Sequence, residues 1–301
     1  MGSLSRRRFL AGTAGAFGAV GFAASSGSLL AACGGGATSA SSGDAASGGA
    51  TSDFKLIQFF KSGAYAGDVP QRLPFGLGDK GGVLQSGGPS IVTFHVLDAD
   101  GKKEVVPPVT VNRHSRDLSR PYWPLEVNLP PGSYLARMVY GSKTVEPAAF
   151  DVTDPAKVTV LHAGQKLPAL DTPTTANGRG VDPICTRTPP CPLHETSLAA
   201  ALGAGRPIAF LVATPAHCQT AICGPVLDVL LKQRTADITM IHAEVFTDST
   251  LKTPTDALQK TGLDYEPCLF LARADGTITE RLDVIFDTDE VISALGRLRK
   301  T

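Results

Sequence analysis

Between residues 54 and 167 the apolar side chains follow the alternating pattern of strands. Three runs rich in β-branched and aromatic residues are bounded by Gly, Pro and Asp, at residues 54–60, 90–101 and 133–141. Within the second run the alternation is partial, with Val92, Phe94 and Val96 set against Ile91, Thr93 and His95. Asp-Gly and Pro-Gly segments between the runs are typical of turns. The pattern therefore predicts an all-β domain over 54–167.

A connector rich in Pro, Thr and Gly follows at residues 168–183, and beyond it the pattern changes. Apolar positions now alternate between helical spacing and continuous runs, which are typical of parallel strands buried on both faces. We expect helices at 195–205, 223–234, 254–262 and 287–299, the last capped by Asp287 or Thr288, and strands at 207–213 and 237–246 with a hairpin at 268–282.

These two patterns predict two domains. The strand spacing over 54–167 suggests an immunoglobulin-like β-sandwich. The alternation of helices and strands over 184–301 predicts an α/β domain. His95, His114 and Trp123 lie in the first domain, where no arrangement of chemical groups is evident, so its role is left open.

The first residues have the order of a secretory signal, with arginines before an apolar stretch rich in Gly and Ala. Arg6-Arg7, followed by Phe9-Leu10, resembles the twin-arginine export signal. We therefore expect residues 1–32 to be a leader that is removed.

The leader ends in Leu30-Ala31-Ala32-Cys33, which resembles the lipobox of bacterial lipoproteins. This resemblance implies lipidation of Cys33 and attachment to the extracytoplasmic face of the cell membrane. Residues 33–53 are nearly all Gly, Ala, Ser or Thr, a composition that predicts a flexible linker.

Charge narrows the choice of partners. The chain has 28 basic and 28 acidic side chains, and loss of the leader's arginines leaves the mature chain slightly acidic. A nucleic-acid partner is therefore not expected. Composition and motifs point to no cofactor or metal. The expected partners are the membrane itself, through a lipid anchor, and other envelope proteins that carry thiols or disulfides.

The candidate chemistry is in the cysteines. Five of the six lie in the last 120 residues, and export would permit disulfides. Cys223 opens a predicted helix, where free N–H groups and the helix dipole favour a thiolate. Cys218 lies five residues earlier, within reach of a disulfide. The pair is interpreted as redox-active, and a fixed loop bridge or a metal site are the other interpretations.

Cys223-Gly224-Pro225-Val226 resembles the active-site turn of thioredoxin-like proteins, with Val226 in place of the second Cys. Glu266-Pro267 lies where that family holds a cis-proline against its disulfide. The resemblance covers about residues 184–300 and implies a thioredoxin-like fold. It also implies a membrane-anchored thiol–disulfide oxidoreductase of the TlpA-like type, with Cys223 as attacking thiol, Cys218 as resolving thiol and Pro267 beside them.

The remaining cysteines receive structural assignments. Cys185 and Cys191 flank a Pro-rich loop and are expected to form a structural disulfide, with a second redox pair as the alternative. Cys268 is expected to be a small buried thiol.

Glu266 is an unusual neighbour for a nucleophilic Cys223, because its negative charge would raise the pKa of the Cys223 thiol.

Other function classes stay open. The segment from Thr214 to Cys223 resembles the Q-type peroxiredoxins, although one residue is inserted and no arginine precedes the strand at 268. His217 and His242 would allow a Sco-type copper protein. A non-catalytic binding lipoprotein is the fourth possibility.

Overall fold

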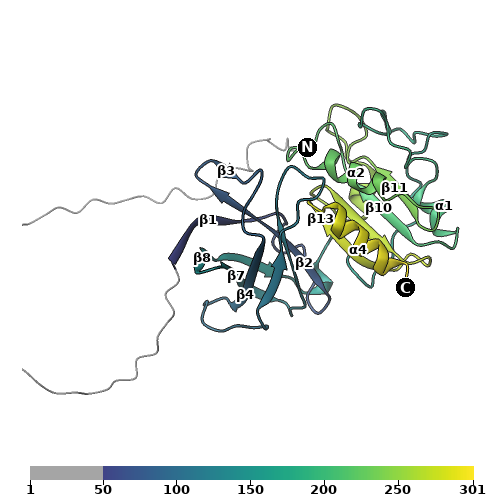
Figure 1. Ribbon diagram of the computed structural model, residues 1–301. Coiled ribbons are helices and arrows are strands. Elements are labelled where there is room, and N and C mark those ends of the chain that lie inside the picture. Colours follow the sequence, from purple (N-terminus) through teal and green to yellow (C-terminus); the bar gives the residue numbers. More distant parts are fainter. Residues whose placement is uncertain (1–49) are drawn as a thin grey trace, which may run out of the picture. The chain divides into compact units, whose positions relative to one another are not determined.

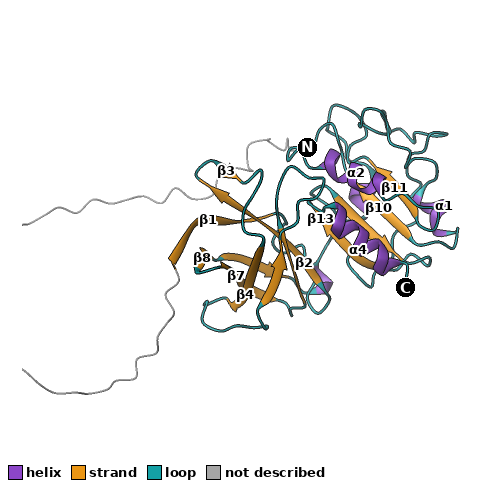
Figure 2. Cartoon of the chain, in the orientation of Figure 1, coloured by secondary structure: helices purple, strands orange, loops and turns teal. Residues whose placement is uncertain are grey.

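A computed structural model describes residues 50–301, which belong to one compact unit (Figure 1). The predicted leader of residues 1–32, Cys33 and nearly all of the linker 33–53 lie outside the described residues. Within 50–301 the chain forms thirteen strands, four α-helices and one 3-10 helix, η1 (Pro155–Lys157) (Figure 2).

The first nine strands form a single mixed sheet, in which β3, β2, β1, β8, β7, β4 and β5 lie in that order. Strand β6 pairs with β2, β9 pairs with β7, and the β1–β8 pair is parallel. The strands are β1 (Ala50–Gln58), β2 (Gln71–Asp79), β3 (Gly82–Val83), β4 (Ile91–Asp98), β5 (Val109–Asn112), β6 (Trp123–Val127), β7 (Gly132–Tyr140), β8 (Lys143–Glu146) and β9 (Ala148–Val152).

Strand β4 shows why this sheet forms. Val92, Phe94 and Val96 are buried, while the side chains between them are exposed or half-buried. Because successive side chains of a strand point to opposite faces, this alternation places one face of β4 on the core. Trp123 and Phe75 are among the side chains that complete this core. The strands expected at 54–60, 90–101 and 133–141 correspond to β1, β4 and β7, so these predictions are confirmed.

A second sheet has four strands in the order β11, β10, β12, β13. Strands β10 and β11 are parallel, and the other two pairings are antiparallel. The elements of this region are α1 (Leu198–Leu202), β10 (Ile208–Val212), α2 (Cys223–Lys232), β11 (Thr239–Ala243), α3 (Asp256–Lys260), β12 (Cys268–Ala272), β13 (Ile278–Asp283) and α4 (Thr288–Leu298). Each predicted helix and strand of this region is confirmed within a few residues.

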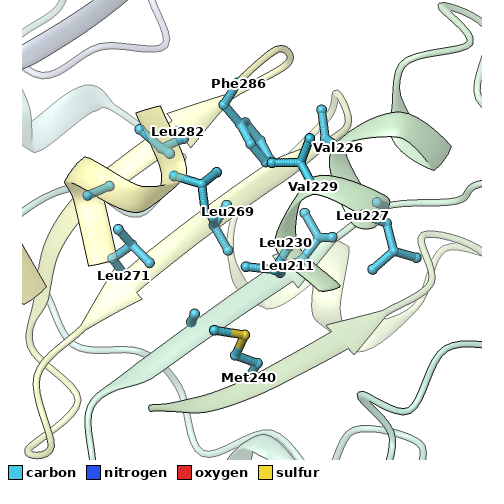
Figure 3. Close-up of a cluster of buried hydrophobic side chains, with 14 of the residues drawn as sticks. Leu211, Val226, Leu227, Val229, Leu230, Met240, Leu269, Leu271, Leu282 and Phe286 are labelled. Atoms are coloured by element: carbon cyan, nitrogen blue, oxygen red, sulfur yellow. The ribbon is translucent and has the colours of Figure 1, made fainter. Parts of the chain in front are cut away.

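The three strands β10, β11 and β12 are buried throughout because both faces of the sheet are covered. Alternate residues of β10 enter different cores: Ala209 and Leu211 pack with α2 and α4, and Phe210 packs on the opposite face with α1 and α3. Figure 3 shows the first of these cores, with Leu211 and Leu269 from the sheet facing Leu230 of α2.

The fold class expected from the sequence has to be corrected. The described chain is mostly β with few helices, and it is not a clear α/β thioredoxin fold. Helices α1 and α3 have only five residues each, because α1 ends at Gly203 and α3 at Thr261. The N-terminal strands form one curled mixed sheet with a parallel pair, where an immunoglobulin-like sandwich would have two antiparallel sheets.

Buried polar contacts join the two expected domains. The guanidinium of Arg72 on β2 donates to both carboxylate oxygens of Glu290 on α4 and to the carbonyl oxygens of Asp283 and Ile285. Arg72 and Glu290 are both buried. Tyr122 also donates to Glu290. Removing one partner of such a buried pair leaves an uncompensated charge, so this contact fixes α4 against β2.

The cap of α4 lies in the same contact. Asp287 caps the helix by accepting from the Glu290 N–H group, as predicted. Its carboxylate also contacts His114 Nδ1 at 2.9 Å and accepts from the backbone N–H groups of Ser115 and Arg116. The sequence suggested that His114 is an isolated side chain. The structure instead places it in the contact between the two sheets. Burial opposes charge on its ring, yet hydrogen bonding to Asp287 raises the pKa of His114.

Candidate functional site

The disulfide Cys218–Cys223 joins an incoming loop to the first residue of α2. The two Cα atoms are 5.9 Å apart, and the Cys223 N–H group donates to the Cys218 sulfur at 3.3 Å. The N-cap residue, Ile222, has no side-chain hydrogen bond to the first turn. Helix α2 therefore begins at one of the two disulfide-bonded residues, Cys223. The expectation that this pair can form a disulfide is confirmed.

The two sulfurs differ in exposure. Cys223 is 0% exposed and packs in the core with Val226 and Leu227 of its own helix. Cys218 is half-buried and is followed by exposed residues, and its sulfur lies 3.2 Å from the hydroxyl oxygen of Thr220. A partner protein can therefore reach Cys218 first, whereas the sequence pointed to Cys223 as the attacking thiol.

Glu266 completes this site. One of its carboxyl oxygens, Oε2, lies 3.5 Å from the Cys223 sulfur and accepts from the Thr214 N–H group at 2.5 Å. The Glu266–Pro267 peptide bond is cis, as the sequence predicts. Burial raises the pKa of Glu266 to about 7, and the nearby carboxylate of Glu244 adds to the effect. The sequence treated Glu266 as a fixed negative charge, but near neutral pH this carboxyl gains and loses a proton.

A second cluster lies in the interior. Cys185, Cys191, His194 and His242 are each at most 4% exposed, and one sulfur or nitrogen atom from each lies within 4.8 Å of the others. Both cysteines are free thiols in the structure, so the expected Cys185–Cys191 disulfide is corrected here. Their sulfurs face the imidazole of His242, at 3.8 and 3.5 Å from Nδ1.

The cluster favours a thiolate. Hydrogen bonding from Cys191 is the main cause that lowers the pKa of Cys185, and the two imidazoles add to it. The same contact raises the pKa of Cys191. Burial opposes charge on His242, but its hydrogen bond to Cys185 raises the pKa of the ring. This set of sulfur and imidazole groups has the ligand types that Zn²⁺ and Cu⁺ prefer.

Thr186 connects this cluster to the disulfide loop. Its N–H group donates to the Glu244 carboxylate at 2.6 Å, and its hydroxyl oxygen accepts from the Ala216 N–H group at 3.1 Å. Glu244 is buried, and this burial raises the pKa of its carboxyl. Ala216 lies two residues before Cys218, so the Thr186 side chain, next to Cys185, holds the loop that carries the half-buried sulfur.

Sequence reasoning missed His194 and Glu244. One signal was available for His194, since the spacing Cys191-Pro-Leu-His194 places two metal-ligand types three residues apart. Glu244 follows a buried strand without any motif. His242 was considered only beside Cys218 and Cys223, whereas the structure places it with the other pair.

The other candidate residues lie in different surroundings. Cys268 is buried, as expected, and its sulfur lies 3.2 Å from a carboxyl oxygen of Asp283. Burial raises the pKa of this thiol well above its usual value. His217 is exposed on the disulfide loop. His114, Asp287 and Glu290 lie close together, but their oxygens already accept from Arg72, Tyr122 and the start of α4.

The chain matches no family model, and no curated protein is significantly similar to it. None of the helices within residues 50–301 is long and apolar enough to cross a membrane.

Proposed function

We propose that this protein is a thiol–disulfide oxidoreductase that uses the Cys218–Cys223 pair. The observation that carries the proposal is the asymmetry of the disulfide, with one half-buried sulfur on a loop and one buried sulfur at the start of α2. Disulfide exchange needs an accessible sulfur to attack and a second sulfur that leaves as a stable thiolate. Cys218 fits the role of the attacked sulfur, and Cys223 fits that of the sulfur that leaves.

The exchange proceeds in two steps. A thiolate of the partner protein attacks the Cys218 sulfur, the bond to Cys223 breaks, and Cys223 leaves as a thiolate. A second thiolate of the partner then attacks the partner sulfur in this mixed disulfide and releases Cys218. The partner dithiol is oxidised to a disulfide by two electrons, and the Cys218–Cys223 disulfide is reduced to two thiols. The same steps in reverse reduce a partner disulfide.

The site stabilises the leaving sulfur in two ways. Cys223 is the first residue of α2 and therefore lies at the positive end of the helix dipole, which favours a thiolate there. Glu266 stands 3.5 Å from the same sulfur, and a carboxyl with a pKa of about 7 is protonated in part at neutral pH. Glu266 therefore donates its proton to the departing Cys223 thiolate, and it accepts the proton of the Cys223 thiol when the disulfide forms again.

Single-cysteine variants test this assignment. Reduced Cys223→Ser protein, incubated with insulin, is expected to form a mixed disulfide through Cys218 that is visible on a non-reducing gel. Cys218→Ser protein should form far less of this adduct, because the thiol of Cys223 is buried, as are those of Cys185, Cys191 and Cys268. Cys268→Ala is the matched control, since it removes a buried thiol outside the site and should leave exchange unchanged. Rapid peroxide consumption by Cys218, without any adduct or insulin reduction, would replace this proposal with a thiol peroxidase.

We further propose that the exchange takes place on the extracytoplasmic face of the cell membrane, with Cys33 lipidated. This part rests on the leader motifs alone. Replacing Cys33 with Ala should move the protein from the membrane fraction to the soluble fraction after carbonate washing. An Arg6→Lys, Arg7→Lys variant should stay in the cytoplasm. A Cys33→Ala protein that still sediments with membranes would contradict the lipid anchor.

A further inference from the structure

Four buried side chains behind the disulfide loop converge on one point. Cys185 and Cys191 come from the loop before α1, His194 follows three residues later, and His242 comes from the middle of β11. The ligand-type atoms of all four lie within 4.8 Å of one another. Nothing in the proposed exchange at Cys218 and Cys223 uses this cluster, so its chemistry has to be explained separately.

The separations agree with a tetrahedral shell. His242 Nδ1 is 3.2 Å from His194 Nε2, and 3.5 and 3.8 Å from the sulfurs of Cys191 and Cys185. Zn–N distances of about 2.0 Å and Zn–S distances of about 2.3 Å in a tetrahedron imply ligand atoms about 3.3 to 3.8 Å apart. The three separations from His242 Nδ1 therefore agree with such a shell, and all four ligand atoms lie within 4.8 Å of one another.

The orientation of His242 supports a ligand role. Its Nε2 atom lies 2.9 Å from the carbonyl oxygen of Ala213, which only accepts hydrogen bonds. The Nε2 atom therefore carries a proton, so that in the neutral ring the lone pair of Nδ1 faces the two sulfurs. A backbone carbonyl that holds the far nitrogen of a histidine is the usual second contact of a metal-binding imidazole.

We propose that Cys185, Cys191, His194 and His242 bind one zinc ion in a closed tetrahedral site. All four corners are protein atoms and each side chain is buried, so no position is open for water or substrate. Such a site is structural. It ties the 185–191 loop to β11, and through Ala213 and Thr186 it supports the loop that carries Cys218.

Metal content tests the proposal directly. The full chain, produced with zinc in the medium and passed over a desalting column with EDTA, should retain about one zinc per molecule. His194→Asn and His242→Asn should lose at least about ten-fold in zinc affinity. His217→Asn is the matched control, because it removes an exposed histidine of the neighbouring loop, and it should keep the metal.

A cobalt titration covers the case in which these variants do not fold. Wild-type protein that has been reduced and freed of metal should bind one Co²⁺ and show the visible bands of tetrahedral coordination with thiolate charge transfer. Cys191→His should keep one ion and lose about half of the charge-transfer intensity. Folded wild-type protein without zinc and without these bands would overturn the site. So would a Cys185–Cys191 disulfide in zinc-supplied protein, or copper that replaces the zinc in equimolar competition.

The zinc site and the exchange function fail separately in these experiments. Loss of insulin exchange with normal zinc content would contradict only the role of Cys218 and Cys223. Normal exchange without metal would contradict only the zinc site.

Discussion

Cys218 and Cys223 are five residues apart and Cys185 and Cys191 are six apart, yet only the first pair forms a disulfide in the structure. In the first pair the sulfurs are bonded, one of them is partly exposed, and a carboxyl lies beside the other. In the second pair both sulfurs are free and buried, and imidazoles lie beside them. Spacing along the chain permits a bridge in either case.

Surroundings decide between the two outcomes. A half-buried sulfur on a loop, bonded to a buried sulfur at a helix start, can exchange with partners, while buried thiols beside two imidazoles have the ligand set of a metal site. The pairs are also connected, since Thr186 holds the loop of Cys218 from the neighbourhood of Cys185. We propose that the first pair is reactive and the second is supporting, and four changes test this separation.

The largest expected effect is on exchange activity. Cys218→Ser should lower the rate of insulin reduction by at least roughly 1,000-fold, because the attacked sulfur is gone. Zinc content should not change. Turbidity of reduced insulin measures the first quantity and atomic emission the second. A Cys218→Ser protein that loses its zinc would show that the two pairs are not separate.

The second effect is on stability and belongs to the other pair. Cys185→Ser removes a proposed zinc ligand and should lower the free energy of unfolding by several kcal/mol, because metal binding is coupled to folding. Thermal unfolding of the full chain with and without dipicolinate measures it. The chelator should lower the melting temperature of the wild type and leave that of Cys185→Ser unchanged. Equal responses in both proteins would contradict a stabilising metal.

The third effect depends on pH and on Glu266. The pKa of this carboxyl is about 7 in the folded protein against an ordinary value of 4.5, so the folded state keeps a proton that the unfolded state has released. The free energy of unfolding should therefore fall as pH rises from 4.5 to 7, by at most about 3 kcal/mol, and level off above pH 7.

Glu266→Gln should remove this decline and make the protein relatively more stable at pH 8. It should also remove an inflection near pH 7 in the exchange rate, with about a ten-fold loss of rate below that pH. Urea unfolding at several pH values and stopped-flow exchange measure the two effects. Glu280→Gln on β13, which removes the half-buried partner of Arg297, serves as the control. An unchanged rate profile in Glu266→Gln would contradict proton transfer from this carboxyl.

The smallest effect tests the connection between the pairs. Thr186→Val removes the hydroxyl that accepts from Ala216 and donates to Glu244, and should cost about 1–2 kcal/mol of stability. Exchange should slow by about three-fold because the Cys218 loop loses a support. Thr250→Val, at an exposed turn, is the matched control. No change in exchange would show that the loop is held without Thr186.

Much of the local structure was predictable from the sequence. The buried strands at β10 and β11, the start of α2 at Cys223 and the Asp287 cap of α4 all follow from apolar runs and from residues that favour helix ends. These are short-range properties, so neighbouring residues determine them. The ability of Cys218 and Cys223 to form a disulfide was predictable from their spacing, but the sequence did not reveal that Cys218 is the more accessible of the two sulfurs.

Only the tertiary structure decided the rest. The curled sheet with its parallel β1–β8 pair depends on which strands meet, and strand propensity does not specify this. The pKa of Glu266 depends on burial, which the residues around it in sequence do not reveal. The cluster of Cys185, Cys191, His194 and His242 requires β11 to pass behind a loop about 50 residues earlier in the chain. A disulfide and a metal site use the same cysteines, and long-range packing determines which groups surround them.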